Sequence, residues 1–225
     1  NNIKFISDSA EAFGAKYKNN YVGSQALLHS FSFFGNKNIT TGEGGLVTTN
    51  NQNLFKKLKV LRNQGQNYRY NHIMLGNNFR MNDITASFGI AQFKKLNKII
   101  NFKSRISKKY NKYFKDHKYI ETPYIPKYVS QHGWYAYCIK LKNKKQRDLV
   151  IKQLQNDNID YRISFPPIPL QPYYKKRFKY NKKNFKKSCD IFSRFIDLPN
   201  WYGMKDKEIS YVANSVLKAL NNYEI

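Results

Sequence analysis

Lys37 is the residue whose neighbours best suit it for covalent chemistry. It lies between the aromatic run Phe31–Phe34 and the glycine-rich turn Gly42–Gly45. A lysine amine acts as a nucleophile when apolar walls or nearby cations lower its pKa, and the phenylalanines at 31, 33 and 34 could build such walls. The alternative is that the glycines only form a tight connection to a strand at Leu46–Thr49, with Lys37 solvated on the loop.

An acidic element precedes Lys37 in the sequence. The segment Ile3–Ala15 predicts a short strand that carries Asp8 and Glu11 at its carboxyl end. An aspartate at a strand end is commonly a turn former or a helix cap, so Asp8 considered alone has a purely structural explanation.

An asparagine–arginine element follows, within Leu75–Asn82. It contains Asn78 and Arg80 and lies just before a long predicted helix. Asn78 could simply cap this helix, although Asn82 is better placed for that role. The occurrence of three such elements in this order, with Lys37 in the middle one, favours a functional site over a separate structural explanation for each.

These three elements together resemble the sugar aminotransferases that use pyridoxal phosphate (PLP), the DegT/DnrJ/EryC1/StrS family, and within it the perosamine synthase branch. The resemblance runs from the first residues to the last predicted helix. It implies an α/β fold of the type I PLP-dependent transferases, with a partial large domain that has a mixed sheet and a small C-terminal α/β domain. Residues 1–115 would be the C-terminal part of the large PLP-binding domain, including a long connecting helix, and residues 116–225 the small domain.

The resemblance also implies a role for each candidate residue near the cofactor. Lys37 would bond to the cofactor aldehyde and later move the proton between substrate and cofactor. Asp8 would pair with the pyridine nitrogen and keep it protonated. Glu11 would lie on the hydroxyl side of the ring, and the hydroxyl of Ser32 would hold the phosphate.

Two further residues have implied roles outside that cluster. Asn78 matches an asparagine that family members supply to the phosphate across a dimer interface, and Arg80 matches an arginine suited to an anionic group of the substrate. Pro169 stands where many relatives carry a histidine, so a substrate contact from that side chain is not expected here.

The function that the resemblance implies is transamination of a nucleotide-linked 4-keto-6-deoxy sugar, with glutamate as amino donor, in the synthesis of surface polysaccharide such as O-antigen. The enzyme would be a homodimer. The alternative is a catalytically silent remnant that acts as a binding or structural partner of an intact homologue, through the face that carries Asn78.

The beginning of the chain also bears on these expectations. The sequence starts without methionine, at what would be a strand in the middle of the family's large domain. The family's phosphate-binding glycine turn and the aromatic ring that stacks on the cofactor have no counterpart in it. We therefore expect the isolated chain to bind PLP weakly and to be poorly soluble or oligomeric.

The elements that must position these residues follow from hydrophobic periodicity and from turn residues. A helix is predicted at Asn53–Asn63, and one long helix from Asn82 to about Phe114. The remaining expectations are a loop at Pro123–His132, strands at Trp134–Leu141 and Ile159–Ser164, a helix at Arg147–Gln155, an irregular loop at Phe165–Pro172, a helix at Asn184–Phe195, an extended piece at Ile196–Pro199 and a terminal helix at Asp206–Leu220.

Composition limits the class of protein. The 225 residues are 41% apolar and 16% aromatic, which is ample for a packed core. No stretch approaches the roughly 20 apolar residues of a membrane span, and no secretory leader is visible, so we expect a soluble cytoplasmic protein without a membrane partner. Cys138 and Cys189 are expected to be reduced core residues.

The strong positive charge suggests a polyanionic partner at first sight. There are 40 Lys+Arg against 14 Asp+Glu, which gives +26. The basic residues are spread over every segment and are mostly lysine, whereas base and phosphate recognition favours clustered arginine. We expect no specific nucleic-acid partner, and a basic nucleic-acid-binding protein remains the weaker alternative. The four histidines have no metal-ligand spacing, so no metal is expected.

Overall fold

The computed structural model describes residues 3–163, 165–221 and 223. The chain forms two compact units. Unit 1 contains the residues up to Asn101 together with Ile125–Tyr135, and unit 2 contains Phe102–Tyr124 and the residues from Ala136 onward. The predicted domain boundary at residue 115 stays a prediction about the domains of the whole protein.

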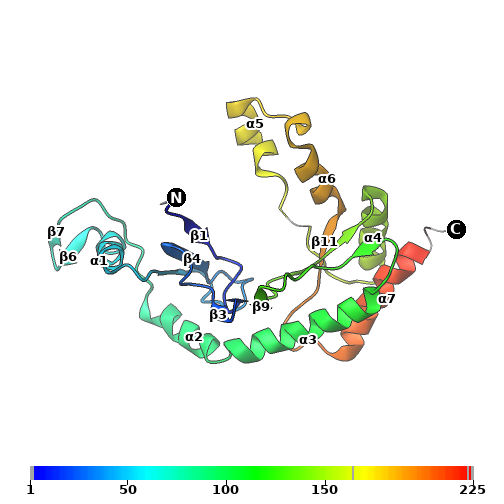
Figure 1. Ribbon diagram of the computed structural model, residues 1–225, viewed down its shortest axis with the longest axis horizontal. Helices are drawn as coiled ribbons and strands as arrows, with labels where there is room; N and C mark the ends of the chain where they lie inside the picture. Colours follow the sequence, from blue (N-terminus) through cyan, green and yellow to red (C-terminus); the bar gives the residue numbers. More distant parts are fainter. Residues whose placement is uncertain (1–2, 164, 222, 224–225) are drawn as a thin grey trace. The chain divides into compact units, whose positions relative to one another are not determined.

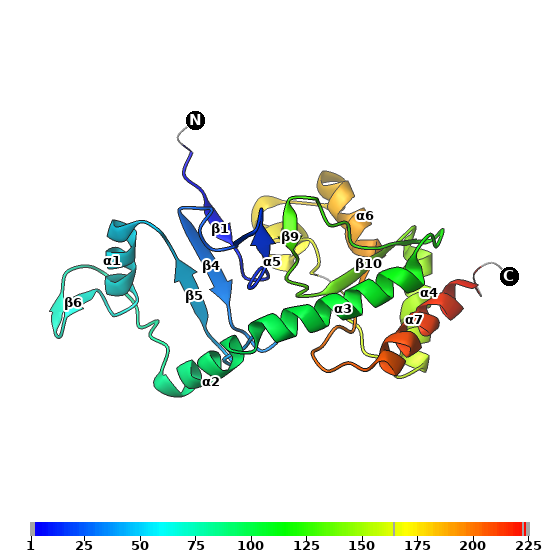
Figure 2. The same cartoon turned by 60° about the horizontal axis from the view of Figure 1, so that its bottom comes forward.

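The main sheet of unit 1 is mixed. Its strands are β1 (Ile6–Asp8), β4 (Leu28–Ser32) and β5 (Gly45–Thr48), in the order β1-β4-β5 (Figure 2). β1 and β4 are parallel, with Asp8 beside Ser30, whereas β4 and β5 are antiparallel. The predicted strands at either end of this sheet are therefore confirmed, and β4 is the strand that the sequence analysis missed.

A second small sheet of unit 1 has the order β3-β2-β9. Its strands are β2 (Lys16–Tyr17), β3 (Asn20–Tyr21) and β9 (Val129–Gln131). The prediction that 123–132 is only a loop was wrong, because β9 pairs with β2, more than a hundred residues earlier. A strand of three residues is too short to show hydrophobic periodicity, so its pairing with a distant strand could not be predicted from the sequence.

The predicted helix after β5 is present as α1 (Gln52–Leu61), and it is followed by the hairpin of β6 (Gln66–Tyr68) and β7 (Asn71–His72). Asn51 caps α1 by accepting the backbone N–H of Leu54 at 3.0 Å.

The single long helix predicted from Asn82 is interrupted. The structure has α2 (Asp83–Phe93) and α3 (Leu96–Phe114) instead. At the break, the backbone N–H of Lys95 bonds to the carbonyl of Gln92, which is the three-residue spacing of a tighter turn and interrupts the α-helical hydrogen bonds. The expected cap is confirmed, because Asn82 accepts the N–H of Thr85 at 2.9 Å.

The core of unit 1 is small and lies under the Lys37 loop. Ile39 packs with Leu96, Ile99 and Ile100 of α3, and Phe13 and Phe33 cover this cluster. Many apolar side chains of unit 1 remain exposed, above all on α2, where none of the residues is buried.

Unit 2 is an antiparallel sheet with helices. The strand order is β11-β10-β8, formed by β8 (Ile120–Glu121), β10 (Tyr137–Leu141) and β11 (Phe195–Leu198). The helices α4 (Lys144–Asn156), α5 (Pro172–Phe178), α6 (Lys186–Arg194) and α7 (Asp206–Asn221) are labelled in Figure 1. Two short 3-10 helices, η1 (Ile168–Leu170) and η2 (Lys182–Phe185), complete the helical segments described in unit 2.

The predicted helix pair of unit 2 is confirmed. α7 buries the four residues expected to face inward, Ile209, Val212, Val216 and Leu220, and it packs on α4. The predicted strand at 159–164 was wrong: Arg162 forms only an isolated bridge with Asp197, and residue 164 lies outside the described residues. Two prolines follow at 166 and 167, and a proline cannot donate to a ladder.

Two smaller expectations also need correction. Pro172 begins α5, and η1 lies within the stretch expected to be an irregular loop. Cys138 and Cys189 were expected in the core, but each is partly exposed. Among the described residues, no helix is long and apolar enough to cross a membrane.

Candidate active site

The candidate site is built at the carboxyl edge of two parallel strands. Asp8 is the last residue of β1 and Ser32 is the last residue of β4. Because Asp8 pairs with Ser30 and side chains alternate along a strand, Asp8, Ser30 and Ser32 belong to one face of this sheet. Parallel pairing therefore places the predicted carboxylate and the predicted hydroxyl at the same edge.

The two strand-end side chains are also engaged locally. Asp8 accepts the backbone N–H of Ala10 through Oδ1 at 3.0 Å, which is the turn-forming role that the sequence allowed. Ser32 accepts the N–H of Phe34 at 3.3 Å. Asp8 is exposed and Ser32 is half-buried, so both can still reach a ligand.

Lys37 lies on the loop between β4 and β5, and its amine contacts Glu11, which follows the end of β1. Its Nζ is 3.4 Å from Oε1 of Glu11 and 4.3 Å from the ring centroid of Tyr135. The side chain of Lys37 is only 13% exposed, so the alternative of a solvated loop lysine does not hold. The structure thus brings Lys37 and Glu11 together, in the same unit as Asp8 and Ser32.

The aromatic wall expected around Lys37 is formed by a different residue. Phe31 and Phe33 both pack on Phe13, with ring centroids 5.2 and 5.3 Å apart, and Phe34 is exposed. The ring that contacts the Lys37 amine belongs to Tyr135, about a hundred residues later in the chain. Its position follows from tertiary structure, and the composition of the 31–34 run did not indicate it.

The glycine-rich turn returns the chain from Lys37 to β5. Gly44 has a φ of +139°, and a Cβ atom on Gly45 would lie 2.7 Å from the carbonyl oxygen of Phe31. The N–H of Phe33 bonds to the carbonyl of Gly44 at 2.9 Å, which closes the loop. The glycines therefore form the tight connection that the sequence suggested, and this connection holds Lys37 at the strand edge.

Asn78 and Arg80 lie on a separate exposed segment. The backbone of this segment bonds to residues 61, 62 and 64 at the end of α1, and Arg80 donates from Nε to Oδ1 of Asn78 at 2.9 Å. In the part of the chain that the structure describes, no hydrogen bond or ion pair joins either residue to Asp8, Glu11, Ser32 or Lys37. Their expected roles therefore stay predictions.

A buried histidine behind the strand edge was missed by sequence reasoning. His29 of β4 is 3% exposed; its Nε2 accepts the backbone N–H groups of Gln25 (3.1 Å) and Ala26 (2.9 Å), and its Nδ1 lies 2.9 Å from Oγ of Ser9. Because Nε2 accepts two hydrogen bonds, the proton of the neutral ring belongs on Nδ1, which donates to Ser9. Burial lowers the pKa of His29, in agreement with this neutral form.

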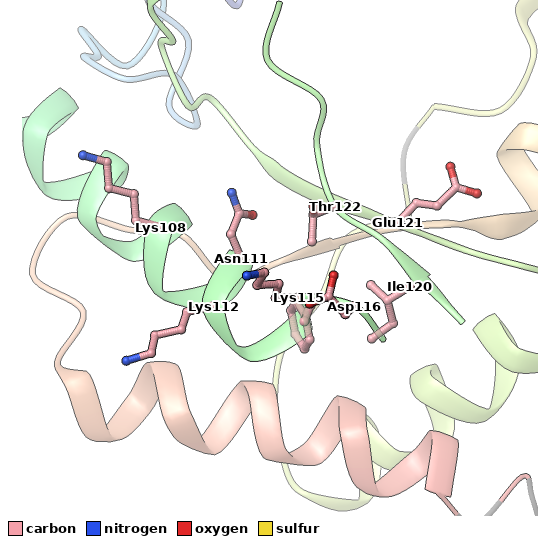
Figure 3. A pocket seen from close by; sticks show the side chains of 9 residues that line it. Lys108, Asn111, Lys112, Lys115, Asp116, Ile120, Glu121 and Thr122 are labelled. Atoms are coloured by element: carbon pink, nitrogen blue, oxygen red, sulfur yellow. The ribbon is translucent and has the colours of Figure 1, made fainter. Parts of the chain in front are cut away.

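An open groove in unit 2 is a weaker candidate. It has a volume of about 680 Å³ and lies between α3 and β8 (Figure 3). Lys108 and Lys112 both line it, but their amines point away from each other, so they do not converge on one anion. No group of three or more histidine, cysteine or acidic side chains that could hold a metal occurs among the described residues.

The chain belongs to the DegT/DnrJ/EryC1/StrS aminotransferase family, whose model it matches over residues 1–217. It is 33% identical over 217 residues to GDP-perosamine synthase of Escherichia coli O157:H7, a match that covers 96% of this chain and 58% of that protein. It is 31% identical over 229 residues to UDP-4-amino-4,6-dideoxy-N-acetyl-beta-L-altrosamine transaminase of Helicobacter pylori, with coverages of 99% and 60%.

The fold agrees with this family. The Streptococcus pneumoniae protein Spr1654, solved in its PMP form, matches with a TM-score of 0.89 and 26% identity, over 98% of this chain and 59% of that one. The predicted family and fold class, a mixed α/β part of the sugar aminotransferase fold, are therefore confirmed. The chain spans about 60% of the length of the relatives it matches.

Proposed function

We propose that the protein containing this chain is a PLP-dependent aminotransferase that acts on a nucleotide-linked sugar. The observation that carries the proposal is the assembly, in one unit, of a strand-end carboxylate (Asp8) and a covered amine (Lys37) held by Glu11. The family match and the names of the two curated relatives support the same class of reaction.

The donor set suits the three polar parts of PLP. The carboxylate of Asp8 would hold the protonated pyridine nitrogen, the hydroxyl of Ser32 would bind the phosphate, and the amine of Lys37 would face the aldehyde. When bound, the cofactor supplies an electron sink for the carbanion formed at the reacting carbon. Asp8 sustains that sink by keeping a positive charge on the ring.

The remaining side chains have supporting roles in this proposal. Glu11 pairs with the Lys37 ammonium, and it would lie on the hydroxyl side of the bound cofactor ring. Among the described residues, no hydrogen bond or ion pair joins Asn78 or Arg80 to Lys37. In this proposal Asn78 serves the phosphate across a dimer interface, and Arg80 binds an anionic group of the substrate.

The relatives support a finer proposal for the amino acceptor. We propose a 4-keto-6-deoxy sugar linked to GDP as the amino acceptor, because identity to GDP-perosamine synthase of Escherichia coli (33%) is slightly higher than identity to the UDP-sugar transaminase of Helicobacter pylori (31%). Glutamate is the proposed donor, and the enzyme would act as a cytoplasmic homodimer in surface polysaccharide synthesis, including O-antigen.

Covalent trapping tests this function directly. The purified chain is mixed with PLP and reduced with borohydride, and the modified lysines are mapped by peptide mass. Label concentrated on Lys37 and lost in Lys37→Ala is the expected result. Label scattered over the many surface lysines, with no preference for Lys37, would show that the assigned amine is not part of a cofactor site.

A further inference from the structure

The Lys37 amine is held between a carboxylate and an aromatic ring. Glu11 lies on one side at 3.4 Å, and the ring centroid of Tyr135 lies at 4.3 Å. The face of an aromatic ring attracts a cation, and the attraction grows as water is excluded. With only 13% of the lysine side chain exposed, the ring contact restricts where the amine can point.

The backbone that delivers this ring is unusual. Trp134 has a φ of +49°, in the left-handed region that bulky residues rarely adopt, and its side chain is 6% exposed. The N–H of Trp134 donates to Nδ1 of His132 at 3.0 Å, and the two rings lie 4.3 Å apart. Such a conformation persists only where its surroundings hold it in place, and it is found preferentially at functional sites.

A side chain next to Lys37 holds the same segment. Asn38 is 7% exposed and donates from Nδ2 to the carbonyl of Gly133 at 2.6 Å and to the carbonyl of Phe13 at 3.3 Å. Its amide thus ties the residue after Lys37 to the residue before Trp134. The bond to Gly133 couples the position of Lys37 to that of the segment carrying Tyr135, and the bond to Phe13 anchors the same amide.

We propose that Tyr135 is a further catalytic residue of the Lys37 site, and that Asn38 and His132 are positioning residues that hold its ring against the amine. The proposal rests on the proposed function, because it gives the ring a role in presenting the amine to an aldehyde. Ring and carboxylate fix the amine before the aldehyde arrives, so less orientational freedom is lost when the two groups react.

The ring contact itself is tested without any cofactor. Trace acetic anhydride acetylates amines, and peptide mass gives the relative reactivity of each lysine. Tyr135→Leu should raise the acetylation rate of Lys37 about fivefold, the factor expected when one cation–ring contact is lost. Tyr135→Phe keeps the ring, so Lys37 should stay largely protected from acetylation. Unchanged reactivity of Lys37 in Tyr135→Leu would overturn the proposal.

A matched surface pair serves as the control. Lys16 lies over the ring of Tyr21 at 4.5 Å, in the same unit. Tyr21→Leu should raise the acetylation of Lys16 and leave that of Lys37 unchanged. An equal rise at both lysines in every variant would indicate general loosening of the fold, and would contradict a specific role for Tyr135.

The role in presenting the amine is tested by PLP and borohydride labelling. Tyr135→Leu should lower the labelled fraction of Lys37 several-fold even though the amine becomes more reactive toward anhydride. Asn38→Asp, which removes the hydrogen-bond donor to Gly133, should lower the labelled fraction of Lys37 in the same way. The double variant Tyr135→Leu/Asn38→Asp should show a labelled fraction of Lys37 no lower than that of either single variant, because both substitutions act through the same contact. Thermal unfolding of each variant confirms that folded chains are compared.

The outcomes separate the two proposals. If Tyr135→Leu labels like the wild type, the catalytic role of Tyr135 is wrong while the proposed function stands. If the wild type shows no preference for Lys37, the proposed function fails, and the anhydride experiment still decides whether the ring covers the amine.

Discussion

The amine of Lys37 lies 3.4 Å from a carboxylate oxygen of Glu11, although 26 residues separate them in the sequence. Glu11 follows the end of β1 and Lys37 follows the end of β4. The parallel pairing of these two strands brings their carboxyl ends together, so the contact is a consequence of the sheet. Glu11 is therefore in place to meet Lys37 before any ligand is bound.

Replacement of this carboxylate should affect stability little. Glu11 is 49% exposed, and an exposed ion pair contributes about 0–1 kcal/mol. We expect Glu11→Gln to unfold within about 1 kcal/mol of the wild type and to keep PLP labelling at Lys37, because an amide can still accept from the amine. Urea unfolding and peptide mapping measure the two effects, and complete loss of the Lys37 label would contradict this prediction.

The buried His29 predicts a decline in stability at low pH. Its two ring nitrogens are occupied as acceptor and donor, and burial lowers its pKa. The unfolded chain, with an ordinary histidine pKa of about 6.5, therefore binds more protons than the folded chain below that pH. The free energy of unfolding should fall as the pH drops below about 6.5, as measured by urea titration at several pH values.

A substitution at His29 should weaken this dependence at a cost in stability, while His132, whose pKa is also lowered by burial, retains part of it. His29→Phe leaves two backbone N–H groups without their acceptor and removes one of the two side-chain partners of the Ser9 hydroxyl, so we expect a loss of about 2–4 kcal/mol at pH 7.5. The exposed His72 is the matched control: His72→Gln should keep both the stability and its decline at low pH. A decline that persists unchanged in His29→Phe would assign the effect to other groups.

The buried carboxylate of Asp197 should be important for the stability of unit 2. It is 5% exposed and accepts from Nε of Arg162 at 2.7 Å. Asp197→Ala should cost about 2 kcal/mol, because it removes a buried carboxylate and its charge-assisted hydrogen bond to Arg162, whose side chain is 39% exposed. Asp190 pairs with Arg194 but is 57% exposed, so Asp190→Ala should cost less than about 1 kcal/mol. Thermal unfolding compares the two, and equal losses would contradict the argument.

Alanine substitutions at two glycines with positive φ distinguish the cost of a steric clash from the cost of backbone strain. Gly65 (φ +75°) would place a Cβ atom 1.7 Å from the carbonyl oxygen of Met74, whereas Gly42 (φ +81°) has open space at that position. Gly42→Ala should cost about 1 kcal/mol from the backbone conformation alone. Gly65→Ala should cost at least about 2 kcal/mol more and displace the segment that carries Asn78. Hydrogen exchange of residues 73–80 would detect that displacement, and normal protection there would rule it out.

Local sequence signals determined much of the fold. The inward residues of α7 recur at helical spacing, so they predicted the helix and its buried face. Asn82 caps α2 because its side chain reaches an N–H three residues later, a contact within one short segment. By contrast, β9 and the single bridge at Arg162 depend on partners far along the chain, and short segments carry no local sign of such pairing.

The candidate site likewise has features that the local sequence indicates and features that only the tertiary structure determines. The resemblance of the residue order to the family proposed Asp8, Glu11, Ser32 and Lys37 as candidates, and their roles at a cofactor stay predictions. The chemistry that a carboxylate, a hydroxyl or an amine can do is a property of each side chain and can be read from the sequence. Tertiary structure decided which groups meet. Parallel pairing of β1 and β4 placed Glu11 beside Lys37, and the strained backbone at Trp134, rather than the nearby phenylalanines, placed a ring on the amine. The physical reason is that a contact between distant residues depends on the path of the whole backbone, whereas the chemistry of a side chain does not.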